Sequence, residues 1–410
     1  MVPEGWEKTT LEGLIDIHHG FAFKSEYFTD SGQYVLMTPG SFYEEGGFRD
    51  QGPKTKYYSG DIPSGYLLKK GDILIAMTEQ AEGLLGSTAR VPEGGKYLHN
   101  QRLGLIKIKE PRKVNLDFLY WLYNFEAIRS QISEQASGTK VKHTSPGRLV
   151  GITALLPTIN EQEKIAKILS TWDQAIAAAE QLLENSLQQK KALMQQLLGS
   201  HESAEEDGEQ DFKRISEIAE RIQRKSDGGD HPVLTISSLS GFVRQDEKYN
   251  RFMAGKSVDS YIFLKHGEFA YNKGNSKTYE FGCIFDLSSF ETGLVPHVYV
   301  CFKLKPGLSH RYFKYLFEAD YLKPQLSQLV NTGVRNNGLL NIKPSEFMNT
   351  KVPVPSLEEQ ERIADILHIA SKQIMALEQK LACLKQEKKA LMQQLFTGKR
   401  RVTVDAKEAM

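Results

Sequence analysis

Polar and basic side chains gather in short segments next to the apolar runs of this chain. In the first half these residues are Thr78, Glu79, Gln80, Gln101, Arg102, Thr139, Lys140, Lys142 and His143. In the second half they are Asn272, Lys273, Asn275, Ser276, Lys277, Arg335, Asn336 and Asn337. Asn, Gln and Arg carry the donors and acceptors that read base edges in DNA, whereas Lys more often binds phosphates. We therefore predict DNA contacts from these segments, and the alternative for any one residue is a solvated loop side chain.

Motifs for catalysis are missing from the sequence. The chain has no Pro-Pro pair, so it lacks the Asn/Asp-Pro-Pro-Tyr/Phe tetrad of adenine methyltransferases, and it has no Phe-x-Gly-x-Gly cofactor loop. Residues 255–257 (Gly-Lys-Ser) end like a phosphate-binding loop, but Asn250 stands where the first glycine belongs. No nucleophile is paired with a base in a known motif. We predict a non-catalytic binding protein that binds no cofactor itself.

Metal binding is not indicated either. His18 and His19 are adjacent, and no cluster of acidic, His and Cys residues supports them as ligands, so a surface or packing role is the better interpretation. The three cysteines, at positions 283, 301 and 383, match no zinc spacing, and an odd number favours reduced thiols. We expect all three to be packing residues.

The charge of the chain is nearly balanced. It has 52 basic and 51 acidic residues, which argues against tight DNA binding by the chain alone, because phosphate neutralisation supplies much of that affinity. Residues 1–156 carry 18 basic and 18 acidic side chains, and residues 212–354 carry 20 and 14. If the chain binds DNA, its positive charge must be concentrated on one face, or a partner must supply the rest.

Length and composition favour two globular units. A chain of 410 residues with 40% hydrophobic and 25% charged residues is too long for one ordinary core. It has no apolar run near the roughly 20 residues of a spanning helix. Acidic residues at positions 4, 7 and 12 stand where a secretory signal would be basic and apolar. We expect a cytoplasmic protein with no membrane association.

An internal repeat is the strongest signal in the sequence. Residues 157–169 (Pro-Thr-Ile-Asn-Glu-Gln-Glu-Lys-Ile-Ala-Lys-Ile-Leu) resemble residues 355–367 (Pro-Ser-Leu-Glu-Glu-Gln-Glu-Arg-Ile-Ala-Asp-Ile-Leu) at an offset of 198 (355 − 157). At the same offset, residues 190–197 and 388–395 are both Lys-Lys-Ala-Leu-Met-Gln-Gln-Leu. Chance does not easily produce this match without a gap, so a segment of some forty residues is duplicated.

Both copies of the duplicated segment are predicted to be long helices. Apolar residues recur in alternating steps of four and three, the heptad seam of a coiled coil. At about 1.5 Å per residue, residues 161–198 would form a rod of roughly 57 Å. An ordinary helical hairpin or a dimerisation coil is the alternative for one such stretch. The seam residues that we predict to pair the helices and to dock partners are Ile165, Leu169, Trp172, Ile176, Leu183, Ile363, Leu367, Ile374, Leu377, Leu381 and Leu384, with Ser186, Lys190 and Lys388 as interruptions.

A block of mixed structure precedes each long helix. Predicted strands cover residues 34–37, 71–76 and 103–108 in one block and 233–236, 268–271 and 298–302 in the other. Aromatic-rich helices are predicted over residues 116–133 and 310–329. Each block then has a glycine-containing polar loop, residues 137–143 or 331–337, before the long helix. The whole half is therefore repeated, with diverged loops.

This order of blocks and helices, with Pro-x-x-x-Glu-Gln-x-x-Ile at 157–165 and 355–363, resembles the specificity subunits of type I restriction–modification systems over essentially the full chain. The loops at 138–140 (Gly-Thr-Lys) and 333–335 (Gly-Val-Arg) also resemble that family, although Val334 departs from the commoner Thr. The resemblance implies a two-part target in double-stranded DNA, with one half read by each block. It also implies two methyltransferase (modification) subunits and restriction/translocase subunits as partners, which would carry S-adenosylmethionine, ATP and Mg²⁺.

The predicted fold is α+β, with two globular mixed domains separated by two long antiparallel coiled-coil helices and an internal pseudo-two-fold repeat. The predicted parts are a first recognition domain (1–156), a long helix (157–198), an acidic linker (199–211), a second recognition domain (212–354), a second long helix (355–398) and a tail (399–410) that we expect to be loose. Two other functions stay open. An interaction scaffold would suit the balanced charge, and a self-sufficient nuclease or methyltransferase would need motifs that the sequence lacks.

Overall fold

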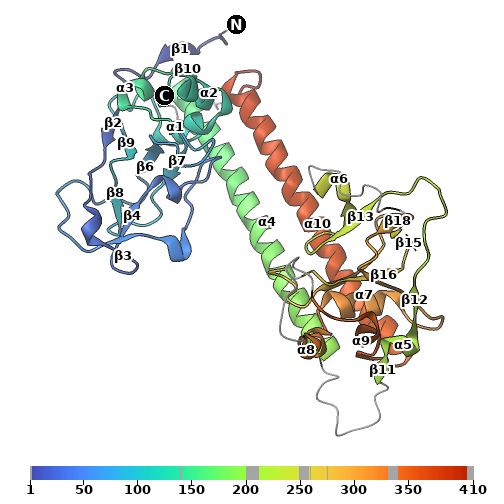
Figure 1. Ribbon diagram of the computed structural model, residues 1–410. Helices are drawn as coiled ribbons and strands as arrows, with labels where there is room; N and C mark the ends of the chain where they lie inside the picture. Colours follow the sequence, from blue (N-terminus) through green and yellow to red (C-terminus); the bar gives the residue numbers. More distant parts are fainter. Residues whose placement is uncertain are drawn as a thin grey trace. The chain divides into compact units, whose positions relative to one another are not determined.

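The computed structural model describes residues 2–138, 141–199, 212–248, 258, 260–274, 276–330 and 340–403. The chain forms two compact units (Figure 1). The first unit combines residues 1–179 with residues 380–410, and the second consists of residues 180–379. Each unit therefore holds one block together with part of both long helices.

The first unit is built around a four-stranded antiparallel sheet in the order β2 (Ile15–His19), β9 (Leu103–Ile108), β6 (Ile73–Ala76) and β7 (Thr88–Arg90). A smaller sheet has the order β3 (Phe28–Thr29), β5 (Tyr57–Tyr58), β4 (Tyr34–Met37) and β8 (Tyr97–His99). Strand β1 (Glu7–Thr10) pairs with β10 (Thr153–Leu156). The helices of this block are α1 (Leu116–Asn124), α2 (Glu126–Glu134) and the short α3 (Pro146–Val150).

The second unit repeats this plan. Its four-stranded sheet has the order β12 (Ala219–Ile222), β19 (Val300–Leu304), β16 (Phe269–Asn272) and β17 (Cys283–Asp286). Three two-stranded sheets pair β11 (Phe212–Arg214) with β20 (Lys351–Pro353), β13 (Leu234–Ser237) with β14 (Gly241–Arg244), and β15 (Ile262–Lys265) with β18 (Thr292–Val295). Its helices are α5 (Ile215–Ile218), α6 (Gln245–Lys248), α7 (His310–Glu318), α8 (Lys323–Leu329) and α9 (Pro344–Met348).

The two long helices are α4 (Ile159–Gly199) and α10 (Leu357–Phe396). In the first unit, Ile165 and Leu169 of α4 share a buried core with Leu395 and Phe396 of α10. In the second unit, Met194 and Leu198 of α4 share a core with Ile363 and Leu367 of α10. The beginning of each long helix thus lies with the end of the other, which is an antiparallel arrangement. The predicted fold class is confirmed.

The predicted seam residues differ in their surroundings. All eleven are buried or half-buried. Ile165, Leu169, Ile363 and Leu367 lie inside the cores of the two units, where they contact the globular blocks. A partner protein would therefore have to contact other residues of these helices.

Each of the two predicted aromatic helices is in fact a pair of helices. The segment 116–133 breaks at Phe125, whose backbone is extended (φ −73°, ψ 132°) and whose ring stacks on Phe396 of α10 at 5.1 Å. The segment 310–329 breaks near Asp320, which has φ 55°, a conformation rare for residues other than glycine. The apolar periodicity continues across both breaks, so the sequence did not reveal them. Among the helices that the structure describes, none has the length and apolar character needed to cross a membrane.

Candidate nucleic-acid interface

Three of the predicted DNA-contacting segments of the first unit meet at one end of the four-stranded sheet. Strand β6 ends at Ala76 and its antiparallel neighbour β9 begins at Leu103, so the residues that follow β6 lie beside those that precede β9. The Met77 N–H donates to the Arg102 carbonyl at 3.0 Å, and the Glu79 N–H donates to the Lys142 carbonyl at 2.9 Å. Segments 78–80, 101–102 and 142–143 thus form one surface, which we call the first loop cluster.

The polar loop at 137–143 is closed by its own backbone. The Ser137 N–H donates to the His143 carbonyl at 3.0 Å, and the His143 N–H donates to the Ser137 carbonyl at 2.8 Å. Gly138 has φ 111°, and a Cβ atom there would lie 2.2 Å from the Val141 carbonyl oxygen, so this position requires glycine. Thr139 and Lys140, two of the predicted contacts, fall outside the described residues.

The residues of the first loop cluster differ in how far their side chains are exposed to solvent. Gln80, Gln101, Arg102, Lys142 and His143 are exposed, and Glu79 is half-buried. Thr78 is buried, and its Oγ1 lies 3.2 Å from Nδ1 of His143, within hydrogen-bond distance. Thr78 is therefore placed to orient the His143 ring.

Arg129 of α2 anchors this cluster, and the sequence analysis missed it. Its Nε donates to the Leu85 carbonyl at 2.7 Å, and its other nitrogens donate to the carbonyls of Gly83 and Glu44. Burial lowers the pKa of Arg129 to about 10. The side chain therefore fixes the end of the loop that begins at Thr78. An arginine on a helix gives no sequence signal of such distant partners.

The second unit builds the corresponding cluster with an equivalent hydrogen bond. The Leu340 N–H donates to the Lys273 carbonyl at 3.0 Å, and in the first unit the Thr144 N–H donates to the Met77 carbonyl at 3.0 Å. Leu340 lies 196 positions after Thr144, and Lys273 lies 196 positions after Met77 (340 − 144 and 273 − 77). Leu340 therefore lies beside Lys273 as Thr144 lies beside Met77. We call this surface the second loop cluster.

The described side chains of the second loop cluster are held by local bonds. Oδ1 of Asn272 accepts from the Gly274 N–H at 3.0 Å, and Oγ of Ser276 accepts from the Tyr279 N–H at 3.0 Å. Lys277 is exposed. Asn275, Arg335, Asn336 and Asn337 fall outside the described residues.

The repeated Glu-Gln of the two motifs has a structural role. Gln162 is fully buried, and its Oε1 accepts from the backbone N–H of Asn115, the N-cap of α1, at 2.9 Å. Gln360 is equally buried, and its Oε1 accepts from the backbone N–H of Ser309, the N-cap of α7, at 2.9 Å. Each glutamine thus joins the start of a long helix to the start of a domain helix. The glutamines of the motif that carries the resemblance therefore hold the fold together.

The expectation of a loose tail is wrong for the residues that the structure describes. Nε of Arg401 donates to Oε1 of the buried Glu161 at 2.8 Å, and the Trp6 indole N–H donates to the other carboxylate oxygen at 3.1 Å. Arg401 also donates to the Glu4 carbonyl at 2.8 Å. A buried carboxylate needs such partners, and the tail supplies one of them.

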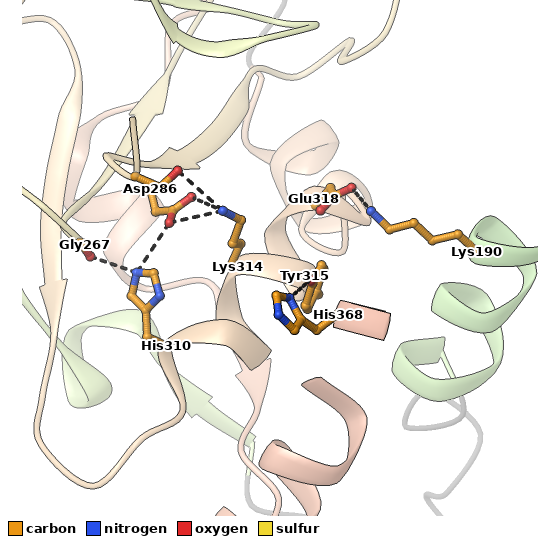
Figure 2. A network of polar contacts seen from close by, with 9 residues as sticks. Lys190, Gly267, Asp286, His310, Lys314, Tyr315, Glu318 and His368 are labelled. Carbon is orange, nitrogen blue, oxygen red and sulfur yellow. Dashed lines mark hydrogen bonds and ion pairs between the residues drawn. The ribbon is translucent and has the colours of Figure 1, made fainter. Parts of the chain in front are cut away.

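A polar network in the second unit joins the sheet to α7 and the long helices (Figure 2). Nζ of Lys314 lies 3.2 Å from Oδ1 of the buried Asp286, and Nε2 of His310 donates to the Gly267 carbonyl at 3.0 Å. Burial is the main cause that lowers the pKa of His310. In the first unit an ion pair also joins a strand to a helix, but with the charges exchanged. Arg90 of strand β7 pairs with Asp117 of helix α1 at 2.5 Å.

The members of this network bond to one another, so it supports the fold. Within the described ranges, no group of three or more His, Cys, Asp or Glu residues could hold a metal ion. The three cysteines have no disulfide partner; Cys283 and Cys301 are buried, whereas Cys383 is exposed, so the packing role expected for all three is wrong for Cys383.

Known proteins resemble the chain over most of its length. Residues 3–189 and 210–386 match the family described as type I restriction modification DNA specificity domain. The specificity subunit of the type I restriction enzyme MjaVIII from Methanocaldococcus jannaschii is 27% identical over 73% of this chain and 73% of its own. The EcoBI specificity subunit from Escherichia coli is 29% identical over 48% of this chain and 39% of its own.

The fold has relatives among solved structures. The S subunit of a type I restriction–modification system from M. genitalium has a TM-score of 0.58 at 16% identity, covering 98% of this chain and 97% of its own. A chain from a structure of type I system assembly and conformational transition has a TM-score of 0.52 at 15% identity, covering 97% and 98%. Because the family matches both halves, the chain belongs to the type I restriction–modification DNA specificity family and is a DNA-recognition subunit, not an enzyme.

Proposed function

We propose that the first and second loop clusters read the two halves of an asymmetric target in double-stranded DNA, one half per unit. The observation that carries this proposal is the equivalent pair of hydrogen bonds, Thr144 to Met77 and Leu340 to Lys273. In each unit they join the residue after a central sheet strand, β6 or β16, to a residue a few positions before a short helix, α3 or α9. The side chains presented beyond these bonds differ, which suits a target with two different halves.

Within each cluster the residue types suggest separate tasks. Gln80, Gln101 and Arg102 are exposed side chains of the kind that read base edges, and Lys142 is suited to a phosphate. In the second cluster, Asn272 and Ser276 are half-buried and hold the turn, while the exposed Lys277 is suited to a phosphate. Asn275 and residues 335–337 stay predicted contacts.

We also propose that the chain works with two methyltransferase subunits and with restriction/translocase subunits, which bind S-adenosylmethionine, ATP and Mg²⁺. The net charge of +1 favours partners that supply further positive charge. The long helices carry exposed apolar side chains, Leu182, Leu187, Ile369 and Met375, that suit protein contacts. In the second unit a groove of about 1270 Å³ runs along these helices and is lined by Leu187, Met375 and Leu239. We propose that the helices also set the spacer between the half-sites.

The test is co-expression of this chain with the methyltransferase subunit of its own system, followed by sequencing of modified bases across the host genome. The expected result is one methylated motif with two specified halves and an unspecified spacer. A methyltransferase that is active with this chain but modifies no such motif would contradict the proposal. A scaffold without DNA specificity would give that second result.

A further inference from the structure

Strand β2 brings two histidines to the end of the sheet that carries the first loop cluster. Its last residue, His19, is paired with Gly104, one residue into β9, and β9 follows directly after Arg102. His18 and His19 are both exposed, whereas Ile15 and Ile17 of the same strand are buried. His19 therefore borders the Gln101–Arg102 turn, and His18 precedes it with its side chain on the opposite face of the sheet.

Backbone hydrogen bonds join the residues that follow His19 to the Gln101–Arg102 turn. The Gly20 N–H donates to the Leu103 carbonyl at 3.3 Å, and the Gln101 N–H donates to the Phe21 carbonyl at 2.9 Å. A Cβ atom at Gly20 would lie 2.1 Å from the Asn100 carbonyl oxygen, so only glycine permits this close approach. The residues after His19 and the turn at Gln101 are thus held as one piece.

Aromatic packing supports the same piece. The Phe21 ring lies 5.1 Å from the Phe23 ring and 5.3 Å from the Tyr66 ring, between centroids. Tyr66 in turn lies 6.3 Å from the buried His99 ring. Side chains on a packed support are placed before a ligand arrives, so less conformational entropy is lost on binding.

We propose that His18 and His19 bind the DNA backbone beside the first half-site, an inference that rests on the proposed function of the first loop cluster. The sheet order places β2 at the edge, while β9 and β6 are central. An edge position suits contact with the flanking phosphates, and the central segments suit the bases. A protonated imidazole donates charge-assisted hydrogen bonds to phosphate, and histidine changes charge between about pH 5 and 8.

The charged groups around the pair leave it available for phosphate. On β2, Asp16 is paired with Lys109 at 2.8 Å, and on the neighbouring strand Lys107 is paired with Asp72 at 3.1 Å. The turn contributes the exposed Arg102 and the buried His99. Helix α3, which packs against β2, contributes the exposed Arg148. The neighbouring carboxylates are therefore already neutralised by lysines, and the other neighbours are basic.

The second unit offers an internal comparison. Strand β12, the counterpart of β2, is followed by the exposed Gln223 and Lys225. Neither side chain changes charge between pH 6 and 8 in the ordinary way of histidine. The contribution of the histidine pair should therefore concern the first half-site.

The experiment uses the full chain in complex with the methyltransferase subunit and a duplex with the methylated target found by sequencing. Binding is measured at pH 6 and pH 8 over a range of salt concentrations for the wild type, the double variant His18→Gln/His19→Gln and the control His266→Gln. His266 is an exposed histidine that precedes β16, at the end of that strand opposite to Asn272. The double variant should bind roughly tenfold more weakly at pH 6 and within about twofold of wild type at pH 8. Its salt slope at pH 6 should fall by about one to two.

Two results would overturn the inference: a double variant with the pH and salt profile of the wild type, or an equal loss at both pH values, which indicates a structural role. The variant Arg102→Ala/Lys142→Ala separates this failure from failure of the proposed function. If that variant weakens the first half-site while the histidine variant does not, only the inference fails. If neither affects binding, the first loop cluster is not the DNA-reading surface.

Discussion

The ammonium group of Lys388 lies 4.5 Å from the centre of the Trp121 ring, and it also pairs with Asp173 of α4. Lys190, which precedes Lys388 by 198 positions in the repeat, lies 5.4 Å from the centre of the Tyr315 ring. It pairs with Glu318 at 2.6 Å (Figure 2). Both lysines interrupt the heptad seam. At each of these two interruptions, an aromatic residue of a domain helix therefore lies beside the seam lysine.

Replacing Lys388 with methionine should destabilise the first unit by about 1–2 kcal/mol, because the cation–π contact and the ion pair are both lost while the side-chain volume is kept. Chemical denaturation of the full chain, followed by fluorescence, measures this change. Lys389→Met is the matched control, since Lys389 is exposed and its pair with Glu126 lies at the surface. An equal effect of both substitutions would show that the contact with Trp121 contributes nothing.

Gln162→Ala should cost about 2–3 kcal/mol of unfolding free energy. The substitution leaves the Asn115 N–H and the carbonyls of Lys113 and Pro157 without their partner in a buried place. The neighbouring Glu163 is exposed, and Glu163→Ala should change the stability by less than about 0.5 kcal/mol. Thermal unfolding of both variants decides the matter, and a Gln162→Ala protein as stable as the wild type would contradict this role.

His99 should make the chain less stable in mild acid. Burial lowers the pKa of His99 to about 4, and its Nε2 bonds to the Leu103 carbonyl at 2.9 Å. Between pH 6.5 and 4 the unfolded chain takes up a proton that the folded chain does not, so stability falls as the pH falls. The loss is on the order of 1–2 kcal/mol at pH 5. His99→Gln should remove this part of the pH dependence, and an unchanged slope in denaturation at pH 7.5 and 5 would speak against it.

Asp320→Asn should stabilise the second unit by about 1 kcal/mol at pH 7.5, after allowance for partial exposure. Desolvation raises the pKa of Asp320 to about 6, so the folded state carries an unfavourable ionised carboxylate above that pH. Asparagine avoids the charge and tolerates the φ of 55°. The gain should shrink as the pH falls to 4.5, where the aspartate is protonated. A gain that is independent of pH would refute the electrostatic cause.

Arg102→Ala should weaken recognition of the first half-site by about 1–3 kcal/mol and leave the second half-site unchanged. The matched control is Arg112→Ala, because Arg112 is exposed and follows β9 at the end opposite to Arg102. Competition binding with duplexes altered in one half at a time reports the two halves separately. Equal relaxation of both halves would mean that the units do not read independently.

The sequence was sufficient for the plan of the fold. The identity of residues 190–197 and 388–395 at one offset revealed the repeat, and the heptad spacing predicted helices that the structure places at Ile159–Gly199 and Leu357–Phe396. These signals are local or repeated, so they survive without an alignment. The breaks at Phe125 and Asp320 were missed because the apolar periodicity runs through both.

The site was only partly accessible from sequence. The polar loops were predicted one by one, but their meeting depends on the sheet order, which is a long-range property. Arg129 and the His18–His19 pair show the limit. Arg129 bonds a carbonyl 44 residues away, and the histidines reach the loop cluster only because β2 pairs with β9. No local sequence pattern predicts either of these two relationships.

The hydrogen bonds from Thr144 to Met77 and from Leu340 to Lys273 divide each unit into a part that must be kept and a part that can change. On one side lie the sheet, the domain helices and the long helices, whose packing depends on buried residues. On the other side, in the first unit, lies the loop 137–143, whose ends Ser137 and His143 are joined by two backbone hydrogen bonds, and doubling the length of such a loop costs only about 0.6 kcal/mol. If the first loop cluster reads DNA as we propose, a lineage of such proteins can acquire a new target through changes in this loop without first regaining a stable fold.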